Sequence, residues 1–225
     1  MSRLIYPRIT ATFIVLLLMA LAALFFLVSI DLIGLAFRKL GFPPEYSVLL
    51  LFLSLLGSYV NIPVSEITSR EPIVSGRIIE FYRFRYVVPP LEVERRTIIA
   101  VNIGGAVIPV TISVFLATLV NVSDILIGVS AMTILIHLIA RPVKGLGIAV
   151  PALIPPVAAA ALALLISPGE APIIAYISGT LGSLIGADLL NLKKIPELGT
   201  PVASIGGAGT FDGIFLTGII SVLLA

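Results

Sequence analysis

Two aspartates, Asp188 and Asp212, stand in strongly apolar stretches of the chain and are the residues best suited to chemistry. Both belong to the segment GADLLNLKKIPELGTPVASIGGAGTFDGIFL (residues 186–216), in which a short polar turn separates them. A carboxylate inside a membrane segment is costly, and by default it indicates a functional site. Two carboxylates held a few ångströms apart cannot both be ionised cheaply, so one keeps its proton. Such a pair could supply a general acid and a general base, or it could bind a cation.

The elements that must position these aspartates are membrane helices, because the composition excludes a soluble domain. Of the 225 residues, 59% are hydrophobic and 12% are charged, and the mean hydropathy is +1.18. The absence of cysteine excludes disulfides, thiolate catalysis and Cys-based metal sites, and a single histidine cannot form a multi-His site. We expect no metal and no cofactor. The chain has no basic tract for nucleic acid, so we expect no nucleic acid, and we expect the lipid bilayer as a partner. The sequence does not determine the oligomeric state.

The chain predicts a single membrane domain over residues 1–225, with the fold of an all-α polytopic transmembrane helix bundle of about seven spans. Each apolar stretch is close to the ~20 residues that a spanning helix needs. The expected spans lie at residues 11–36, 46–63, 97–120, 125–140, 148–166, 172–192 and 201–225.

Basic residues are spread unevenly over the predicted loops, and this sets the expected orientation. With seven spans, 12 of the 14 Lys and Arg residues fall on the side of the N-terminus. The positive-inside rule then predicts a multi-pass protein of the cell membrane, with a cytoplasmic N-terminus and the C-terminus outside. Residues 65–96 would be a cytoplasmic loop. Within this loop RIIEFYRFRYVV (residues 77–88) mixes β-branched and aromatic residues with arginines, which predicts a strand or a surface β-hairpin.

A polar layer is expected at the cytoplasmic ends of the predicted helices. Asp188 precedes Lys193 by five residues, which places it ~7–8 Å along a helix from the inner surface. The residues predicted to form the site wall or to contact a substrate are Asn61, Asn102, Pro151, Ala152, Leu153, Gly206, Gly207, Gly209 and Phe211. We interpret His137 as a satisfied interfacial residue and Arg141 as a membrane-surface anchor.

The glycine run SIGGAG (residues 204–209) leaves two interpretations open. It could allow close helix packing, or it could break the start of the last helix and bring backbone groups to the site. If the run is extended, Asp212 lies at the depth of Asp188 in the bilayer and the two can form a pair. If the run is helical, Asp212 lies too deep in the bilayer to reach Asp188. The string IGGA also occurs at residues 103–106, which is weak evidence for a duplicated unit.

Two resemblances follow from these strings. GAGTFDGIFLTGII (residues 207–220) resembles the GxGD segment of intramembrane aspartyl proteases, the presenilin and signal-peptide-peptidase group. That resemblance implies that Asp188 and Asp212 are the catalytic pair, and Pro151-Ala152-Leu153 resembles the Pro-Ala-Leu element of the group. Phe211 stands where the group has glycine. Over most of its length, through strings such as NIGGAVIP and GADLLNL, the chain also resembles a family of uncharacterised prokaryotic integral membrane proteins, which implies no activity.

Three functions remain open at this point. The resemblance favours an intramembrane aspartyl protease-like hydrolase of the inner leaflet, whose substrate would be an unwound transmembrane peptide. That peptide could pair with the strand predicted within residues 77–88. The alternative is a small ion-coupled transporter or channel that uses the same aspartates, with Asn102, for H⁺ or Na⁺. A non-catalytic membrane scaffold is the third possibility.

Overall fold

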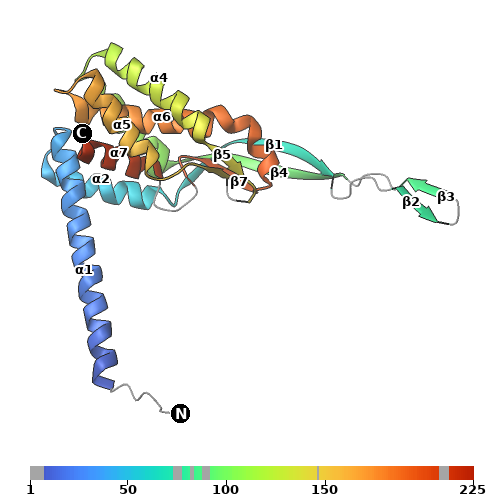
Figure 1. Cartoon of the computed structure of the whole chain (residues 1–225), viewed down its shortest axis with the longest axis horizontal. Coiled ribbons are helices and arrows are strands. Elements are labelled where there is room, and N and C mark those ends of the chain that lie inside the picture. Colours follow the sequence, from blue (N-terminus) through green and yellow to red (C-terminus); the bar gives the residue numbers. More distant parts are fainter. Residues whose placement is uncertain (1–7, 73–77, 82–83, 88–91, 146, 208–212) are drawn as a thin grey trace.

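The chain folds into a helical bundle from which a long β-hairpin and one long helix extend (Figure 1). The computed structural model describes residues 8–72, 78–81, 84–87, 92–145, 147–207 and 213–225. Over these residues the protein is mostly helical. The α-helices are α1 (Arg8–Lys39), α2 (Pro44–Gly57), α3 (Ile108–Leu116), α4 (Val122–Ile139), α5 (Ile154–Ile166), α6 (Ala171–Ser183) and α7 (Gly213–Leu224). Two π-helical turns, η1 (Ile103–Val107) and η2 (Leu184–Asp188), and a 3₁₀ helix, η3 (Leu189–Leu198), complete the helical part.

Three of the described helical segments are long and apolar enough to cross a membrane. They are Ile14–Lys39, Val122–Ile139 and Ala171–Ile195, the last of which continues α6 through η2 into η3. The other apolar helices are shorter: α2, for example, has 14 residues and is therefore ~21 Å long. These apolar helices indicate a membrane protein.

Strands occupy several stretches that the sequence predicted to be helical. In a three-stranded sheet, β1 (Asn61–Pro72) pairs antiparallel with β4 (Glu92–Asn102), and β4 pairs parallel with β7 (Val202–Ile205). A small hairpin joins β5 (Arg141–Val143) to β6 (Gly147–Ala149). The expected helices over residues 61–63, 97–102, 148–149 and 202–205 are therefore wrong. Hydropathy does not distinguish an apolar strand from an apolar helix, and the β-branched residues of TIIAVN (residues 97–102) favour the strand.

The β1–β4 hairpin carries the segment in which the sequence predicted a strand or hairpin. The 11 residues of β4 span about 37 Å. At the far end of this hairpin, β2 (Ile78–Phe81) pairs antiparallel with β3 (Phe84–Val87) (Figure 1). The β2–β3 pair consequently lies far from the helical bundle.

Glycines allow α4 and α6 to pack closely and in parallel. A Cβ added to Gly128 would lie 3.1 Å from the Cβ of Ser178, and one added to Gly182 would lie 2.4 Å from the Cβ of Met132. Gly186 likewise lies against the last turns of α4. The residue numbers of the contacts increase in the same direction along both helices, so α4 and α6 are parallel. Their C-terminal ends therefore lie side by side.

Helix α7 runs antiparallel to α6. Leu184 clusters with Ile214 at one end of the pair, and Gly218 lies against the ring of Tyr176 further along. An added Cβ at Gly218 would lie 2.8 Å from that ring, so only glycine permits this approach. The start of α7 is thereby placed beside η2, which ends at Asp188.

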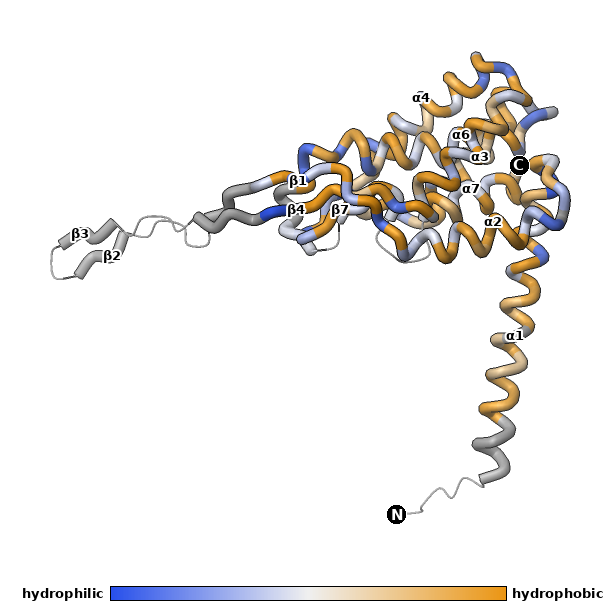
Figure 2. Tube along the Cα trace, turned by 180° about the vertical axis from the view of Figure 1, so that it is seen from behind, coloured by the Kyte–Doolittle hydropathy of each residue, from blue (hydrophilic) through white to orange (hydrophobic). Residues whose placement is uncertain are grey.

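Helix α1 contacts the bundle only near its C-terminal end. Ala36, Phe37 and Leu40 are buried there, and the rest of the long apolar helix extends away from the bundle (Figure 2). Lys39 fixes this end, since its Nζ donates to the backbone carbonyls of Val222 and Leu223 at 3.3 Å each. The last carbonyls of α7 gain a cation that complements the helix dipole.

Candidate functional site

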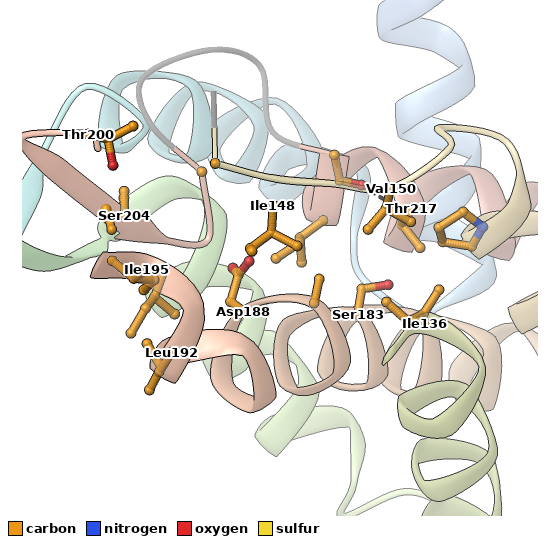
Figure 3. A pocket seen from close by; sticks show the side chains of 18 of the residues that line it. Ile136, Ile148, Val150, Ser183, Asp188, Leu192, Ile195, Thr200, Ser204 and Thr217 are labelled. Atoms are coloured by element: carbon orange, nitrogen blue, oxygen red, sulfur yellow. Dashed lines mark hydrogen bonds between the residues drawn. The ribbon is translucent and has the colours of Figure 1, made fainter. Parts of the chain in front are cut away.

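A cavity of about 290 Å³ lies where η2, β6, β7 and the first turns of α5 and α7 meet (Figure 3). Its wall is mostly apolar, formed by residues that include Ile136, Ile148, Val150, Leu192, Ile195, Ile205 and Ile214. The polar residues of the wall are Ser183, Asp188, Thr200, Ser204 and Thr217. Asp188 is the one residue with an ionisable side chain among the described lining residues.

Asp188 is held by the backbone of the glycine run. Its Oδ2 accepts a hydrogen bond of 2.8 Å from the backbone N–H of Gly206, and the side chain points into the cavity, towards Ile148 (Figure 3). Gly206 and Gly207 have φ values of +85° and +98°, which side chains other than glycine rarely adopt. A Cβ on Gly206 would also lie 2.7 Å from the backbone N of Ala106. Position 206 therefore needs glycine, and this glycine directs its N–H at the carboxylate.

The described part of the glycine run is extended rather than helical. Ser204 and Ile205 belong to strand β7, and the two left-handed glycines follow them. Of the two interpretations that the sequence left open, the described half fits a broken start of the last helix.

Asp188 is the last residue of the π-helical turn η2, and the side chain of Asn191 stabilises this turn through hydrogen bonds to its backbone. The side chain of Asn191 is 1% exposed, and its Nδ2 donates to the carbonyls of Gly186 (3.1 Å) and Ala187 (2.8 Å). His137 Nδ1 lies 3.3 Å from the same Gly186 carbonyl oxygen. These contacts give the Gly186 and Ala187 carbonyls side-chain partners at the point where π geometry changes to 3₁₀ geometry. They also fix the backbone immediately before Asp188.

A second polar cluster, centred on Asn102, joins the strands next to the cavity. Asn102 is fully buried; its Nδ2 donates to the carbonyl of Ser58 (2.7 Å) and to Asn61 Oδ1 (3.1 Å), and its Oδ1 accepts from the N–H of Gly105 (2.8 Å). Ser204 also donates to Asn61 Oδ1. The cluster therefore ties α2, β1, β4 and β7 together at the edge of the cavity.

The structure places the predicted site residues in three groups. Asp188, Ala152 and Gly207 line the cavity, and Gly206 binds the carboxylate. Asn61 and Asn102 belong to the neighbouring polar cluster. Pro151 and Leu153 are exposed and are not among the lining residues. Asp212, Gly209 and Phe211 lie outside the described residues, although Gly213, which follows Asp212 in the chain, lines the cavity.

Several residues of the site were not predicted from the sequence. Ser183 lines the cavity with a buried hydroxyl that has no hydrogen-bond partner in the described structure, and Thr217 lines it from α7. Asn191 and Ser204 occur inside the strings GADLLNL and SIGGAG, so only their polar character in an apolar context could have indicated them. No group of three or more His, Cys, Asp or Glu residues suited to a metal ion occurs in the described part of the chain.

A comparison with protein families identifies the family to which the chain belongs. The family model described as "Protein of unknown function (DUF1614)" matches residues 55–224. The chain belongs to the DUF1614 family. The DUF1614 match includes the cavity, the polar cluster centred on Asn102 and the β1–β4 hairpin, and it begins after α1. Searches of curated proteins and of solved structures gave no match.

Proposed function

We propose that this protein is an intramembrane aspartyl protease-like hydrolase whose catalytic pair is Asp188 and Asp212. The observation that carries the proposal is the cavity, because it contains the half-buried carboxylate of Asp188 and extends to Gly213, the residue after Asp212. The resemblance of residues 207–220 to the GxGD segment adds support. The protein would be a multi-pass protein of the cell membrane, with a cytoplasmic N-terminus and the cavity in the inner half of the bilayer.

The chemistry needs one ionised and one protonated carboxyl group on either side of a water molecule. The carboxylate takes a proton from the water as the water oxygen attacks the carbonyl carbon of the peptide bond. The protonated partner then gives its proton to the amide nitrogen as the C–N bond breaks. Two carboxyl groups close together favour this arrangement, because ionisation of one makes ionisation of the other costly. The N–H of Gly206 holds the Asp188 carboxylate in one orientation throughout.

Strand β7 is the segment best placed to bind an unwound substrate. It pairs with β4 along one edge, and no described strand pairs with its other edge. All four residues of β7 line the cavity. An extended peptide could add to this edge through main-chain hydrogen bonds and present its scissile bond to Asp188. The β2–β3 pair, which the sequence suggested for this role, lies at the far end of the hairpin, away from the cavity (Figure 1).

The test is cleavage of a reporter transmembrane peptide by the purified protein in proteoliposomes. Asp188→Asn and Asp212→Asn should each abolish cleavage while the helix content stays as in the wild type. Asp124→Asn, on α4, is the matched control and should cleave normally. If the wild type cleaves no reporter from a varied set, or if either asparagine variant cleaves as well as the wild type, the proposal is wrong.

One observation favours a second function, that of a small ion-coupled transporter or channel. Asp188 faces a cavity and accepts a hydrogen bond from irregular backbone at the broken start of α7, and broken helices form the ion sites of many transporters. Uptake of Na⁺ or H⁺ into proteoliposomes, lost in Asp188→Asn and without any peptide cleavage, would support this function instead.

A further inference from the structure

Four basic residues lie together where two long helices end. Helix α4 ends at Ile139, and Arg141 and Lys144 follow it in the β5–β6 hairpin; Lys193 and Lys194 lie on η3, at the end of the span that includes α6. His137 and η2 are in contact, and β5 and β6 both contact η3, so the two basic pairs are neighbours. We call these four residues the basic surface.

The basic surface has a net positive charge. All four side chains are exposed, and none has an acidic partner among the side chains that the structure describes. The surface stays net positive even if Asp188 and the nearby Glu197, whose side chain is outside the described ones, are both counted as ionised. The surface therefore has charge available for an anion.

The opposite end of the bundle has a different charge pattern. Asp124 lies in the first turn of α4 and Glu170 directly precedes α6, and the loops before these two helices contain no Lys or Arg. Lys39 donates to the last carbonyls of α7, so its charge is used within the fold. Arg38 is also exposed at this end, so the exposed cations that the structure describes in the bundle are four at the end that carries the cavity and two, Arg38 and Lys39, at the opposite end.

Exposed apolar side chains accompany the cations. Leu189 and Leu190, which precede Lys193 and Lys194, are 39% and 50% exposed, and Val143, beside Lys144, is 39% exposed. Apolar side chains next to free cations are typical of a surface at the boundary between hydrocarbon and headgroups.

We propose that the basic surface binds the phosphate groups of anionic phospholipids, at the rim of the cavity. Lysine and arginine near the bilayer surface attract anionic headgroups, and helix C-termini favour cations at this level. The segments that carry the cations also form the cavity wall, through Ile148, Leu192 and Ile195. A bound headgroup would flank the entrance to the cavity. This inference does not depend on the proposed hydrolase activity.

The test compares the full chain in nanodiscs of phosphatidylcholine alone with nanodiscs that also contain phosphatidylglycerol. The wild type should melt several degrees higher with phosphatidylglycerol, and native mass spectrometry should show several-fold more bound phosphatidylglycerol than phosphatidylcholine. The variant R141Q/K144Q/K193Q/K194Q should lose both effects. The matched control R70Q/R77Q/R83Q/R85Q, called the hairpin control because these arginines lie in the stretch of sequence from β1 to β4, removes the same charge and should keep both.

Four results would overturn the proposal. The glutamine variant of the basic surface could retain the preference for phosphatidylglycerol, or the hairpin control could lose it equally, which would indicate an effect of net charge. Inorganic phosphate could raise the melting temperature in detergent as much as the lipid does, which would indicate a free-anion site. If the glutamine variant does not fold, the milder pairs R141Q/K144Q and K193Q/K194Q should each lose part of the preference, and retention of the full preference by both pairs would contradict it.

Discussion

At the scale of single residues, Gly206 combines two requirements that can be separated by experiment. Its positive φ excludes most side chains, and its contact with Ala106 leaves no room for a Cβ. Gly145 has a similar φ of +77° but nothing within 4 Å of an added Cβ. Gly145→Ala therefore measures the cost of the positive φ without a steric clash. We expect Gly145→Ala to cost ~1–2 kcal/mol of unfolding free energy and Gly206→Ala clearly more. Denaturant unfolding in detergent micelles measures both, and equal losses would contradict the close contact.

Asn191 is the second residue whose role gives a prediction. Asn191→Ala removes both hydrogen bonds to the Gly186 and Ala187 carbonyls, and the loss of buried hydrogen bonds is costly. We expect a loss of ~1–3 kcal/mol in unfolding free energy. Ser123→Ala, at an exposed position in the first turn of α4, serves as the control and should stay within ~0.5 kcal/mol of the wild type. An unchanged stability of the Asn191 variant would show that the π-helical turn does not need it.

At the scale of elements, Asn102 joins segments that the chain order keeps apart. Its side chain connects the end of α2, the start of β1 and the first turn of η1 through three hydrogen bonds. Asn102→Ala should therefore destabilise the protein by ~2–4 kcal/mol, more than a single lost bond would. Asn121→Ala is the matched control, because Asn121 precedes α4 without a side-chain cap. Comparable losses in the two variants would mean that the buried cluster contributes little.

The elements also show what the sequence could predict and what it could not. The apolar runs predicted the approximate positions of the helices, because a helix that lies in the hydrocarbon of a membrane needs a continuous apolar sequence. The cost of a buried carboxylate identified Asp188, which the structure places in the cavity. The sheet could not be predicted in the same way, since the pairing of β4 with β7 joins residues about 100 positions apart. Without that pairing, one can infer neither the edge of β7 that has no described partner strand nor the approach of Gly206 to Asp188.

At the scale of the whole molecule, the two ends of the bundle should face opposite sides of the membrane. Helices α4 and α6 run in parallel, so Lys144 and Lys193 lie at one end, whereas Ser123 and Gly169 lie at the other. The natural chain has no cysteine, so a single cysteine can be introduced at each position without background labelling. A membrane-impermeant maleimide applied to intact cells should label Ser123→Cys and Gly169→Cys.

The same reagent should label Lys144→Cys and Lys193→Cys only after the membrane is permeabilised. The expected sides follow from the cations, because lysine and arginine near the ends of spanning helices are retained in the cytoplasm. Labelling of all four positions from outside would show that α4 and α6 do not cross the bilayer. If only Lys144→Cys and Lys193→Cys were labelled in intact cells, the orientation of the protein in the membrane would be opposite to the expected one. The cavity with Asp188 would then open to the exterior, and the substrate of the proposed hydrolase would have to approach from that side.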